Sequence, residues 1–244
     1  MSMRKLAVSV ILPCYNEGPT FKASVQQIIK VLSSLKKPWE IIFVEDKSTD
    51  KTKITVENLV KQILNSKAIF HTRNQGRGKS VSDGIRASRG KICGYLDVDL
   101  EVSLNYIPLF VEEIEKGVDI AIGKRFYESG IKSLGRLLAS KTYALIVKVL
   151  LKIPIEDTEA GYKFFRRSKI LPILAKTKNK EWFWDTEICA RAYFAGLRIS
   201  QIPVLFVRRT DKKSTVRLLP DSWSYIKNII RFKAMTKKKD HKIK

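Results

Sequence analysis

Three carboxylates are spaced two residues apart near the middle of the chain. In the segment KICGYLDVDLEV, an apolar run ends at Leu96 and is followed by Asp97, Asp99 and Glu101. If these residues lie in a strand, alternation places all three carboxylates on one face. Hard oxygen ligands in this arrangement suit Mg²⁺ or Mn²⁺. The alternative is a solvated turn, because Asp-x-Asp also occurs by chance.

The first half of the chain alternates between strand-like and helix-like segments. Strand patterns at 6–12, 39–45, 67–72, 91–97 and 118–123 are separated by helical patterns at 21–35, 52–64, 79–88 and 104–116. This alternation, with runs apolar on both faces, predicts an α/β fold: one domain with a mostly parallel, Rossmann-like central sheet flanked by helices.

Polar clusters follow three of these strand patterns directly. They are Tyr15–Glu17, Glu45–Asp46 and Asp97–Asp99. Ligands of such sheets bind in the crevice beyond the carboxyl ends of the strands. We therefore expect the three clusters to meet in that crevice.

The second half is less regular. Helical patterns cover 131–151 and 184–195, and 197–207 has the pattern of a strand. Residues 237–244 are basic without apolar periodicity, which predicts a disordered tail. We divide the chain into a main domain at 1–215, a basic amphipathic helix at 216–236 and this tail.

The chain is strongly basic. Its 244 residues include 47 Lys and Arg against 24 Asp and Glu, a formal net charge of +23. This excess indicates an anionic partner: nucleic acid, anionic lipid or a phosphorylated substrate. The three Cys residues are far apart in apolar surroundings, as expected of reduced, buried thiols in a cytosolic protein. The longest apolar stretch, 143–153, contains a Lys and is shorter than the ~20 residues of a membrane span.

Two helical patterns combine basic and apolar residues. In the C-terminal one, Trp223, Ile226 and Ile230 share a helical face that Lys227 and Arg231 flank. A basic amphipathic helix with an aromatic residue is typical of a segment in the membrane interface. The alternative is packing on the sheet with the basic side chains in water. The earlier helical pattern has a comparable basic stripe, formed by Lys141, Lys148 and Lys152.

Six motifs resemble those of the family 2 glycosyltransferases. They are VSVILPCYNEG, EIIFVEDKSTDKT, NQGRGKSVSDGIRASRG, LDVDLEV, IGKRF and DTEAGYKFFRR, and the resemblance spans residues 7–214. Their order and spacing are similar to those of the inverting GT-A enzymes, and more narrowly of the polyprenol-phosphate (dolichyl-phosphate) hexosyltransferases. The resemblance implies a GT-A domain at 1–215 that uses Mg²⁺ or Mn²⁺. Such an enzyme moves a hexose from a nucleotide diphosphate sugar, of the UDP-glucose or GDP-mannose type, to polyprenyl or dolichyl phosphate.

The resemblance also implies roles for individual residues. Asp97 and Asp99 match the pair that holds the metal and the diphosphate. Glu101 stands where mannose synthases usually have Gln, and it is a third candidate metal ligand. The nucleotide-sugar-binding residues implied are Pro13, Tyr15, Glu17, Val44, Asp46, Gly76, Gly78, Asp97, Val98 and Asp99. Asn74 belongs with Gly76 and Gly78 to the segment that resembles the family's glycine-bearing loop.

Cations are expected around the acceptor. A lipid phosphate is already anionic, so it needs little help from a general base, and cations should outnumber bases in the site. Arg125 and Arg209 match family phosphate-binding positions, which makes them catalytic candidates beside Asp97 and Asp99; Arg136 is a third candidate cation. The alternative for each Arg is a solvated surface residue. The other acceptor residues implied are Asp157, Gly161 and Ser214.

Two segments favour a UDP-hexose as donor. DTEAGYKFF and EWFWDTEICARA are more similar to the glucosyltransferase branch than to the mannose branch. The aromatic cluster Trp182–Trp184 could stack on a sugar or belong to the core.

Two other functions stay open. A glycosyltransferase acting on a sugar hydroxyl needs a carboxylate base, and Glu187 and Asp157 are the candidates. A nucleic-acid-binding module fits the charge, but it predicts aromatic residues interleaved with basic ones and no acidic clusters at strand ends, the reverse of this sequence. We expect no specific nucleic acid, an anionic membrane surface as partner, and a peripheral place on the cytoplasmic face of a membrane. A membrane-embedded partner protein is a further candidate.

Overall fold

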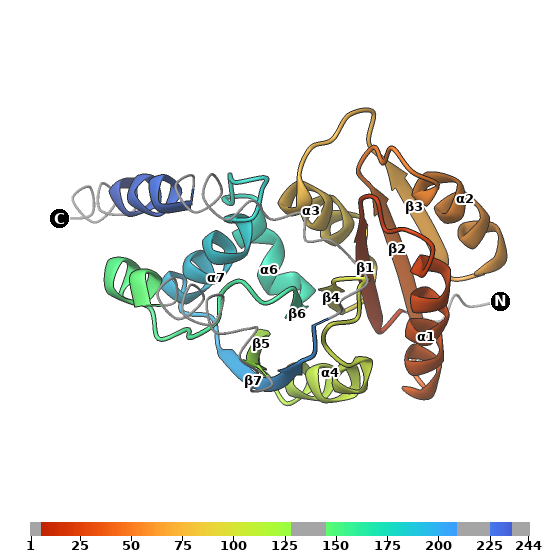
Figure 1. Ribbon diagram of the computed structural model, residues 1–244. Coiled ribbons are helices and arrows are strands. Elements are labelled where there is room, and N and C mark those ends of the chain that lie inside the picture. Colours follow the sequence, from red (N-terminus) through yellow and green to blue (C-terminus); the bar gives the residue numbers. More distant parts are fainter. Residues whose placement is uncertain (1–5, 128–144, 209–224, 236–244) are drawn as a thin grey trace.

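The computed structural model describes residues 6–127, 145–208 and 225–235. In this part of the chain one sheet is formed, with the strand order β3-β2-β1-β4-β6-β5-β7 (Figure 1). The strands are β1 (Val8–Cys14), β2 (Trp39–Glu45), β3 (Ser66–Phe70), β4 (Ile92–Leu96), β5 (Ile120–Tyr127), β6 (Tyr162–Arg166) and β7 (Ile199–Phe206). Only β6 runs antiparallel to its neighbours, β4 and β5. The prediction of an α/β fold with a mostly parallel sheet is confirmed.

Helices cover both faces of the sheet (Figure 1). One face is covered by α1 (Phe21–Ser34), α2 (Thr52–Gln62) and α4 (Ile107–Glu115), which follows the short 3₁₀ helix η1 (Leu104–Tyr106). The other face is covered by α3 (Arg77–Ala87), α6 (Arg167–Leu174), α7 (Trp184–Phe194) and the helical residues 145–151 and 225–235.

The alternation of apolar side chains in the strands produces these two layers. In β1, Val10 and Leu12 pack in the core under α1, whereas Ile11 packs in the core under α3. A Cβ atom at Gly84 of α3 would overlap the side chain of Ile11, so this helix lies against β1 more closely than any other residue there would allow. All three β1 residues are fully buried.

The sheet changes its direction of growth between β1 and β4. The chain adds β2 and β3 on one side of β1 and then β4 on the other. A position where the strand order reverses in this way is a topological switch point. The loops that follow the two parallel strands there diverge and leave a crevice. The three polar clusters predicted to share a crevice lie at this edge, because each follows the C-terminal end of β1, β2 or β4.

The three carboxylates after β4 do not lie in a strand. β4 ends at Leu96, and residues 97–101 form a turn in which Leu100 has a φ of +58°. The backbone N–H of Asp97 donates to Gly161 O at 3.1 Å, which fixes the start of the turn. The expectation that Asp97, Asp99 and Glu101 line one face of a strand is therefore wrong, since a positive φ reverses the chain before alternation can continue.

Two elements lie where no strand or helix was predicted, β6 and α6. The apolar run of β6 is interrupted by Lys163, which looks unsuitable for the middle of a sheet. In the folded protein this side chain is fully buried and paired with Asp185 at 2.6 Å. The partner is 22 residues away in the sequence, so no local pattern indicates it.

The C-terminal helix has two different faces. Tyr225, Ile229 and Phe232 are buried, and the rings of Tyr225 and Phe232 lie 5.1 and 6.2 Å from the ring of Phe183, which precedes α7. Ile230 is 58% exposed. The face predicted from the sequence contains Ile230 and is the exposed one. The opposite face packs on the protein, as the alternative interpretation expected. Trp223 and the predicted tail lie outside the described residues.

The earlier basic helix is described at residues 145–151. Val147 and Leu151 are buried, whereas Leu145, Lys148 and Val149 are exposed. The rest of the predicted helix, with Lys141, lies outside the described residues. Among the helices of the described ranges, none is both long and apolar enough to cross a membrane.

Candidate active site

The loops after β1 and β2 are joined by hydrogen bonds. Asn16 Oδ1 accepts from the N–H of Thr49 at 2.8 Å, and Ser48 Oγ accepts from the N–H of Asn16 at 3.1 Å. Glu17 Oε1 accepts from the N–H of Tyr15, whose side chain is 39% exposed. This part of the expected nucleotide site is therefore a rigid loop that presents the Tyr15 ring to solvent. Beneath it, Pro13 and Val44 are buried at the ends of β1 and β2.

Asp46 holds the glycine-bearing loop at 74–78. Its Oδ1 accepts from Gln75 N at 2.8 Å and its Oδ2 accepts from Gly76 N at 2.9 Å. His71 Nδ1 lies 2.7 Å from Asp46 Oδ1, and Asn74 Nδ2 donates to Asp46 O at 3.2 Å. Asp46 is only 3% exposed. The contact to base or ribose expected for Asp46 stays a prediction, and in this structure both carboxylate oxygens already accept hydrogen bonds from the protein.

Gly76 and Gly78 let this loop approach the segment before α7. Gly76 has a φ of +94°, and a Cβ there would lie 2.6 Å from Lys180 O. A Cβ at Gly78 would overlap the side chain of Trp184. The two glycines thus place Arg77, the residue between them, at the centre of the crevice.

Arg77 joins the glycine loop to the turn after β4. Its Nη2 donates to Asp97 Oδ1 at 2.6 Å, and its Nη1 donates to Asp185 Oδ2 at 2.5 Å. The guanidinium also lies over the rings of Tyr95 and Trp182, at 5.3 and 5.5 Å from their centroids. Burial by itself would lower the pKa of Arg77, but the carboxylates of Asp97 and Asp185 outweigh it and raise the pKa well above its usual value.

Asp185 is the centre of a buried polar network. Lys163 Nζ donates to its Oδ1 at 2.6 Å, and the hydroxyl of Tyr95 donates to the same oxygen. Lys163 Nζ also donates to Ala160 O at 2.5 Å. Burial, followed by the charge of Asp185, raises the pKa of Tyr95 well above its usual value. The network connects α7, β6, β4 and the loop before β6, and so fixes the floor of the crevice.

The turn after β4 offers a partial set of metal ligands. Asp97 is 42% exposed at its side chain, and in the described part of the chain its Oδ2 accepts no hydrogen bond. Asp99 Oδ1 accepts from Glu101 N at 3.3 Å, and Glu101 O accepts from Val207 N at 2.8 Å. No group of three or more His, Cys, Asp and Glu side chains within the described ranges is placed to hold a metal. A divalent ion here would need further oxygens from its ligand.

Arg125 and Asp157 form a buried pair. Arg125 Nε and Nη2 donate to the two oxygens of Asp157 at 2.7 and 2.9 Å, in the fork geometry that guanidinium favours. Burial tends to lower the pKa of Arg125, but Asp157 raises it well above its usual value; burial tends to raise the pKa of Asp157, but Arg125 lowers it. The solvated-surface alternative for Arg125 is wrong, because its side chain is only 17% exposed.

Glu187 has a structural position. Its carboxylate accepts from the N–H groups of Lys178 and Asn179, at 3.1 and 2.7 Å, and from Arg191 Nε at 2.7 Å. It is 2% exposed. Of the aromatic cluster beside it, Phe183 and Trp184 belong to the core, as one of the two interpretations expected.

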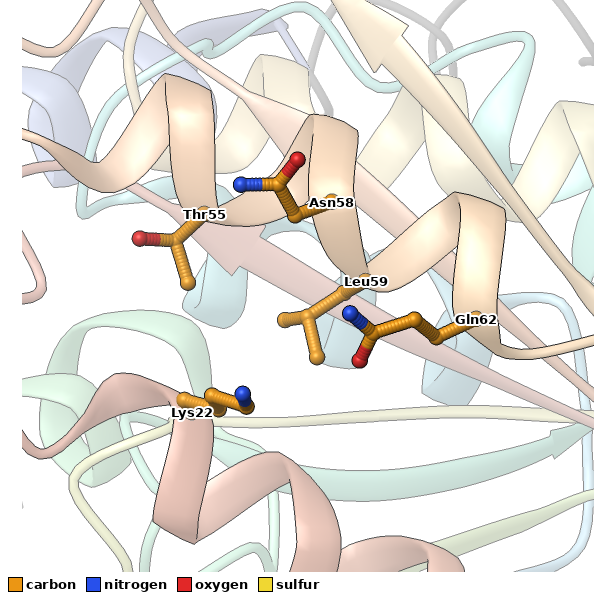
Figure 2. A pocket seen from close by; sticks show the side chains of 5 residues that line it. All are labelled: Lys22, Thr55, Asn58, Leu59 and Gln62. Atoms are coloured by element: carbon orange, nitrogen blue, oxygen red, sulfur yellow. The ribbon is translucent and has the colours of Figure 1, made fainter.

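Figure 2 shows a cavity outside this crevice. It lies between α1 and α2, and the side chains that line it are Lys22, Thr55, Asn58, Leu59 and Gln62. None of the site residues predicted from the sequence lines it. This pocket is therefore separate from the site predicted at the strand ends.

Several site residues were not identified from the sequence, and others lie outside the described residues. Those not identified are Arg77, Tyr95, Lys163 and Asp185, which come from α3, β4, β6 and α7 respectively. In the sequence, only Arg77 has a local feature that points to it, namely the glycine on each side of it. Glu159, in the loop before β6, lies close to the Arg125–Asp157 and Lys163–Asp185 pairs. Arg136, Arg209 and Ser214 fall in ranges that the structure does not describe.

Comparison with known proteins identifies the family. Residues 9–174 match the family described as Glycosyl transferase family 2. The chain belongs to this family. The resemblance to this family read from the six motifs is thereby confirmed. The GT-A type of fold is confirmed by solved structures that share it.

The curated relatives in this family include enzymes named for lipid phosphates. The chain is 30% identical over 213 residues to the dolichyl-phosphate beta-glucosyltransferase of Dictyostelium discoideum, a match that covers 81% of this chain and 65% of that protein. It is 29% identical over 211 residues to glycosyltransferase AglD of Haloferax volcanii, covering 84% of this chain and 34% of that protein. The chain thus spans about a third to two thirds of the length of these relatives.

Solved structures with the same fold include glucosyl-3-phosphoglycerate synthase from Mycobacterium tuberculosis. Its complex with UDP superimposes with a TM-score of 0.65 at 19% identity, covering 93% of this chain and 79% of that one. A second complex contains Mn²⁺, UDP-glucose and phosphoglyceric acid and gives a TM-score of 0.63. At this identity the likeness establishes the fold alone.

Proposed function

We propose that this chain is an inverting glycosyltransferase that moves a hexose from a nucleotide diphosphate sugar to a polyprenyl or dolichyl phosphate. The product is a lipid-linked monosaccharide. Family membership supports the reaction class, and the relatives named as dolichyl-phosphate glucosyltransferases support the acceptor. UDP-glucose is the donor we favour, because those relatives are glucosyltransferases and the neighbouring fold binds UDP-glucose.

One observation favours a phosphate over a sugar hydroxyl as acceptor. The two carboxylates proposed as bases for a hydroxyl, Asp157 and Glu187, are both saturated by hydrogen bonds from the protein. A carboxylate held in this way has no free lone pair directed at a substrate. A phosphate nucleophile needs no such base, because it is already ionised.

Asp97 and Asp99 fit a divalent cation that binds together with the donor. Their donor set consists of carboxylate oxygens only, which suits Mg²⁺ or Mn²⁺, and Oδ2 of Asp97 is not used by Arg77. Oxygens of the diphosphate would complete the coordination. The ion would neutralise charge on the departing nucleoside diphosphate. Glu101 stays a candidate ligand.

Arg77 and Asp97 have separate parts in this site. The Arg77 guanidinium orients Asp97 and adds positive charge near the place where the diphosphate leaves. Arg125, fixed by Asp157, provides the corresponding charge on the acceptor side. The positioning of two anions against each other, rather than proton transfer, is the main task of such a site.

We also propose that two basic helices lie on an anionic membrane surface. Exposed apolar residues alternate there with exposed basic ones: Leu145 and Val149 with Lys148 in one helix, and Ile230 with Lys227 and Arg231 in the other. Both helices are drawn at the left of Figure 1, away from α1 and α2. Each basic residue near an anionic bilayer contributes about 1 kcal/mol to binding. This supports a peripheral place on the cytoplasmic face, where a membrane-embedded partner could deliver the lipid.

The test is a transfer assay with mass analysis of the product. The protein is incubated with Mn²⁺ or Mg²⁺, a panel of UDP- and GDP-sugars, and either farnesyl phosphate or a panel of sugar acceptors. We expect a glucosylated farnesyl phosphate from UDP-glucose only. Asp99→Asn and chelation of the metal should each reduce the rate by roughly a hundredfold or more.

Two results would contradict the proposal. Transfer to a sugar hydroxyl without transfer to farnesyl phosphate would show that the acceptor is a sugar hydroxyl and not a lipid phosphate. Full activity after thorough chelation would exclude the metal site at Asp97 and Asp99. Glu57→Gln is the matched control, since this carboxylate lies in α2, is 43% exposed and pairs with Lys53 at 3.9 Å, away from the strand ends.

A further inference from the structure

Glu159 is a carboxylate beside the Arg125–Asp157 pair, and it has no counter-charge of its own within the described ranges. It lies in the loop before β6, partly exposed, and its backbone N–H donates to Asp157 Oδ1 at 3.2 Å. In the described part of the chain its own carboxylate makes no hydrogen bond or ion pair. It is therefore available to a ligand that enters the crevice.

The charges around Glu159 already balance. Two cations act on Glu159, Arg125 and Lys163, and each is bonded to a carboxylate, Asp157 at 2.7 Å and Asp185 at 2.6 Å respectively. Within this group of four, two positive and two negative charges sum to zero. An ionised Glu159 would make this group negative, and a bound phosphate would add at least one more negative charge.

Four charged groups face Glu159 from the elements packed against it. Asp157 of the same loop and Asp185 of α7 repel its ionised form, whereas Arg125 of β5 and Lys163 of β6 attract it. Burial is the largest influence, and together with the two aspartates it raises the pKa of Glu159 to about 7. The two cations do not prevent this rise, because each is already paired.

We propose that Glu159 binds the acceptor phosphate in its protonated form, so that the site takes up one proton when the acceptor enters. The proton comes from solvent, stays on the Glu159 carboxyl and is donated as an O–H hydrogen bond to a phosphate oxygen. It returns to solvent when the product leaves. No bond to phosphorus forms or breaks in this step. The inference rests on the proposed function, because it assumes a phosphate acceptor.

Acceptor affinity should then fall as pH rises. Above pH 7 the protonated fraction of Glu159 decreases about tenfold for each pH unit, and the dissociation constant of the acceptor increases by the same factor. The second ionisation of a phosphate monoester has a pKa near ~6, so above pH 7 the acceptor is mainly dianionic, and its monoanionic fraction also falls about tenfold for each pH unit. The part of the pH dependence that Glu159→Gln abolishes is therefore the part that reports on Glu159.

The experiment measures binding of farnesyl phosphate by calorimetry, with UDP and Mn²⁺ present, from pH 6.5 to 8.5. Measurements at pH 8 in two buffers with different ionisation enthalpies give the number of protons taken up. For the wild type we expect close to one proton at pH 8 and a dissociation constant that rises more than tenfold between pH 7 and 8.5. Glu159→Gln should take up none and bind with constant affinity.

The matched control is Glu156→Gln. This residue lies three positions earlier in the same loop, is 59% exposed at its side chain and pairs with Lys124 at 2.7 Å. The substitution removes the same charge, but the proton uptake and the pH profile of the wild type should persist. If Glu159→Gln does not fold, Glu159→Ala is measured in its place, because proton uptake by the wild type alone does not distinguish Glu159 from the bound phosphate. Proton uptake that persists in the variant overturns the role of Glu159.

The outcomes separate this inference from the proposed function. Binding that is independent of pH, or a wild type that takes up no proton at pH 8, overturns the role of Glu159 and leaves the phosphate acceptor in place. Absence of farnesyl phosphate binding at every pH, with transfer to a sugar hydroxyl, overturns both.

Discussion

Arg77 donates to one oxygen of Asp97 from two nitrogens, Nε at 3.1 Å and Nη2 at 2.6 Å. The bond fixes Asp97 Oδ1 on the protein side and leaves Oδ2 beside the Cα of Gly161. The first aspartate of the motif is thus oriented by a cation before any metal or nucleotide binds. Asp99 Oδ1 accepts a hydrogen bond from Glu101 N at 3.3 Å within the same turn.

Replacing Arg77 should destabilise the protein strongly. Arg77→Met removes the cation shared by Asp97 and Asp185 and leaves Asp185, which is 2% exposed, short of one counter-charge. We expect the free energy of unfolding to fall by about 3–5 kcal/mol, as for other buried pairs that lose one partner. Urea denaturation measures it. Arg73→Ala, an exposed residue of the same loop, should change it by less than ~0.5 kcal/mol. Equal stability of the two variants would contradict the role of Arg77.

Adding one methyl group at Gly161 should disturb the donor site. The Cβ of Gly161→Ala would overlap Asp97 Oδ2 and lie 2.7 Å from Arg77 Nη2, so Asp97 must move. We expect UDP binding in the presence of Mn²⁺ to weaken at least tenfold, by calorimetry, while the protein loses only about 1–3 kcal/mol of stability. Gly196→Ala is the control: its φ of +72° strains an alanine, but nothing lies within 4 Å of the new Cβ. A similar loss of UDP affinity in both variants would point to general destabilisation instead.

The stability of the protein should depend on pH through Glu159. Its pKa is about 7 in the folded protein against 4.5 as the ordinary value, so the folded state binds the proton more tightly than the unfolded state. The free energy of unfolding therefore decreases as pH rises from 4.5 to 7. Glu159→Gln should remove this loss and be more stable than the wild type at pH 8, by roughly 1–3 kcal/mol, with no difference at pH 4. Parallel denaturation curves at both pH values are the measurement, and an equal difference at pH 4 and 8 would refute the explanation.

Membrane binding should depend on the exposed face of the C-terminal helix. Exchange of Lys227 and Arg231 for Glu should reduce sedimentation with anionic liposomes at low salt by more than tenfold, since each basic residue contributes about 1 kcal/mol. Ile230→Ser should reduce it further. UDP binding should not change, because the donor site lies at the ends of β1, β2 and β4. Exchange of Lys30 and Lys61 for Glu, on exposed positions of α1 and α2, alters the net charge equally and should have a smaller effect. A wild type that ignores anionic liposomes would exclude the membrane face of both helices.

Six strands, β1 to β5 and β7, and five helices, α1 to α4 and α7, could be predicted from the sequence. Their apolar periodicity is local: β1 is buried at all seven positions, and α1 buries Phe21, Val25, Ile28 and Leu32 at helical spacing. β6 could not be predicted in this way, because Lys163 is tolerated only through its contact with Asp185. Because Asp185 is 22 residues away, the sequence around Lys163 does not show that this lysine can be buried in a strand.

The sequence by itself determined which chemistry is present: carboxylates after parallel strands, a glycine-bearing loop, an excess of basic residues and motifs of one enzyme family. Only the tertiary structure decided how those groups are paired. It assigned Asp46 to the glycine loop, Asp157 to Arg125 and Asp97 to Arg77, and it left Glu159 without a counter-charge. The physical reason is that charge balance in a buried crevice depends on distances of a few ångströms between segments that are far apart in the chain.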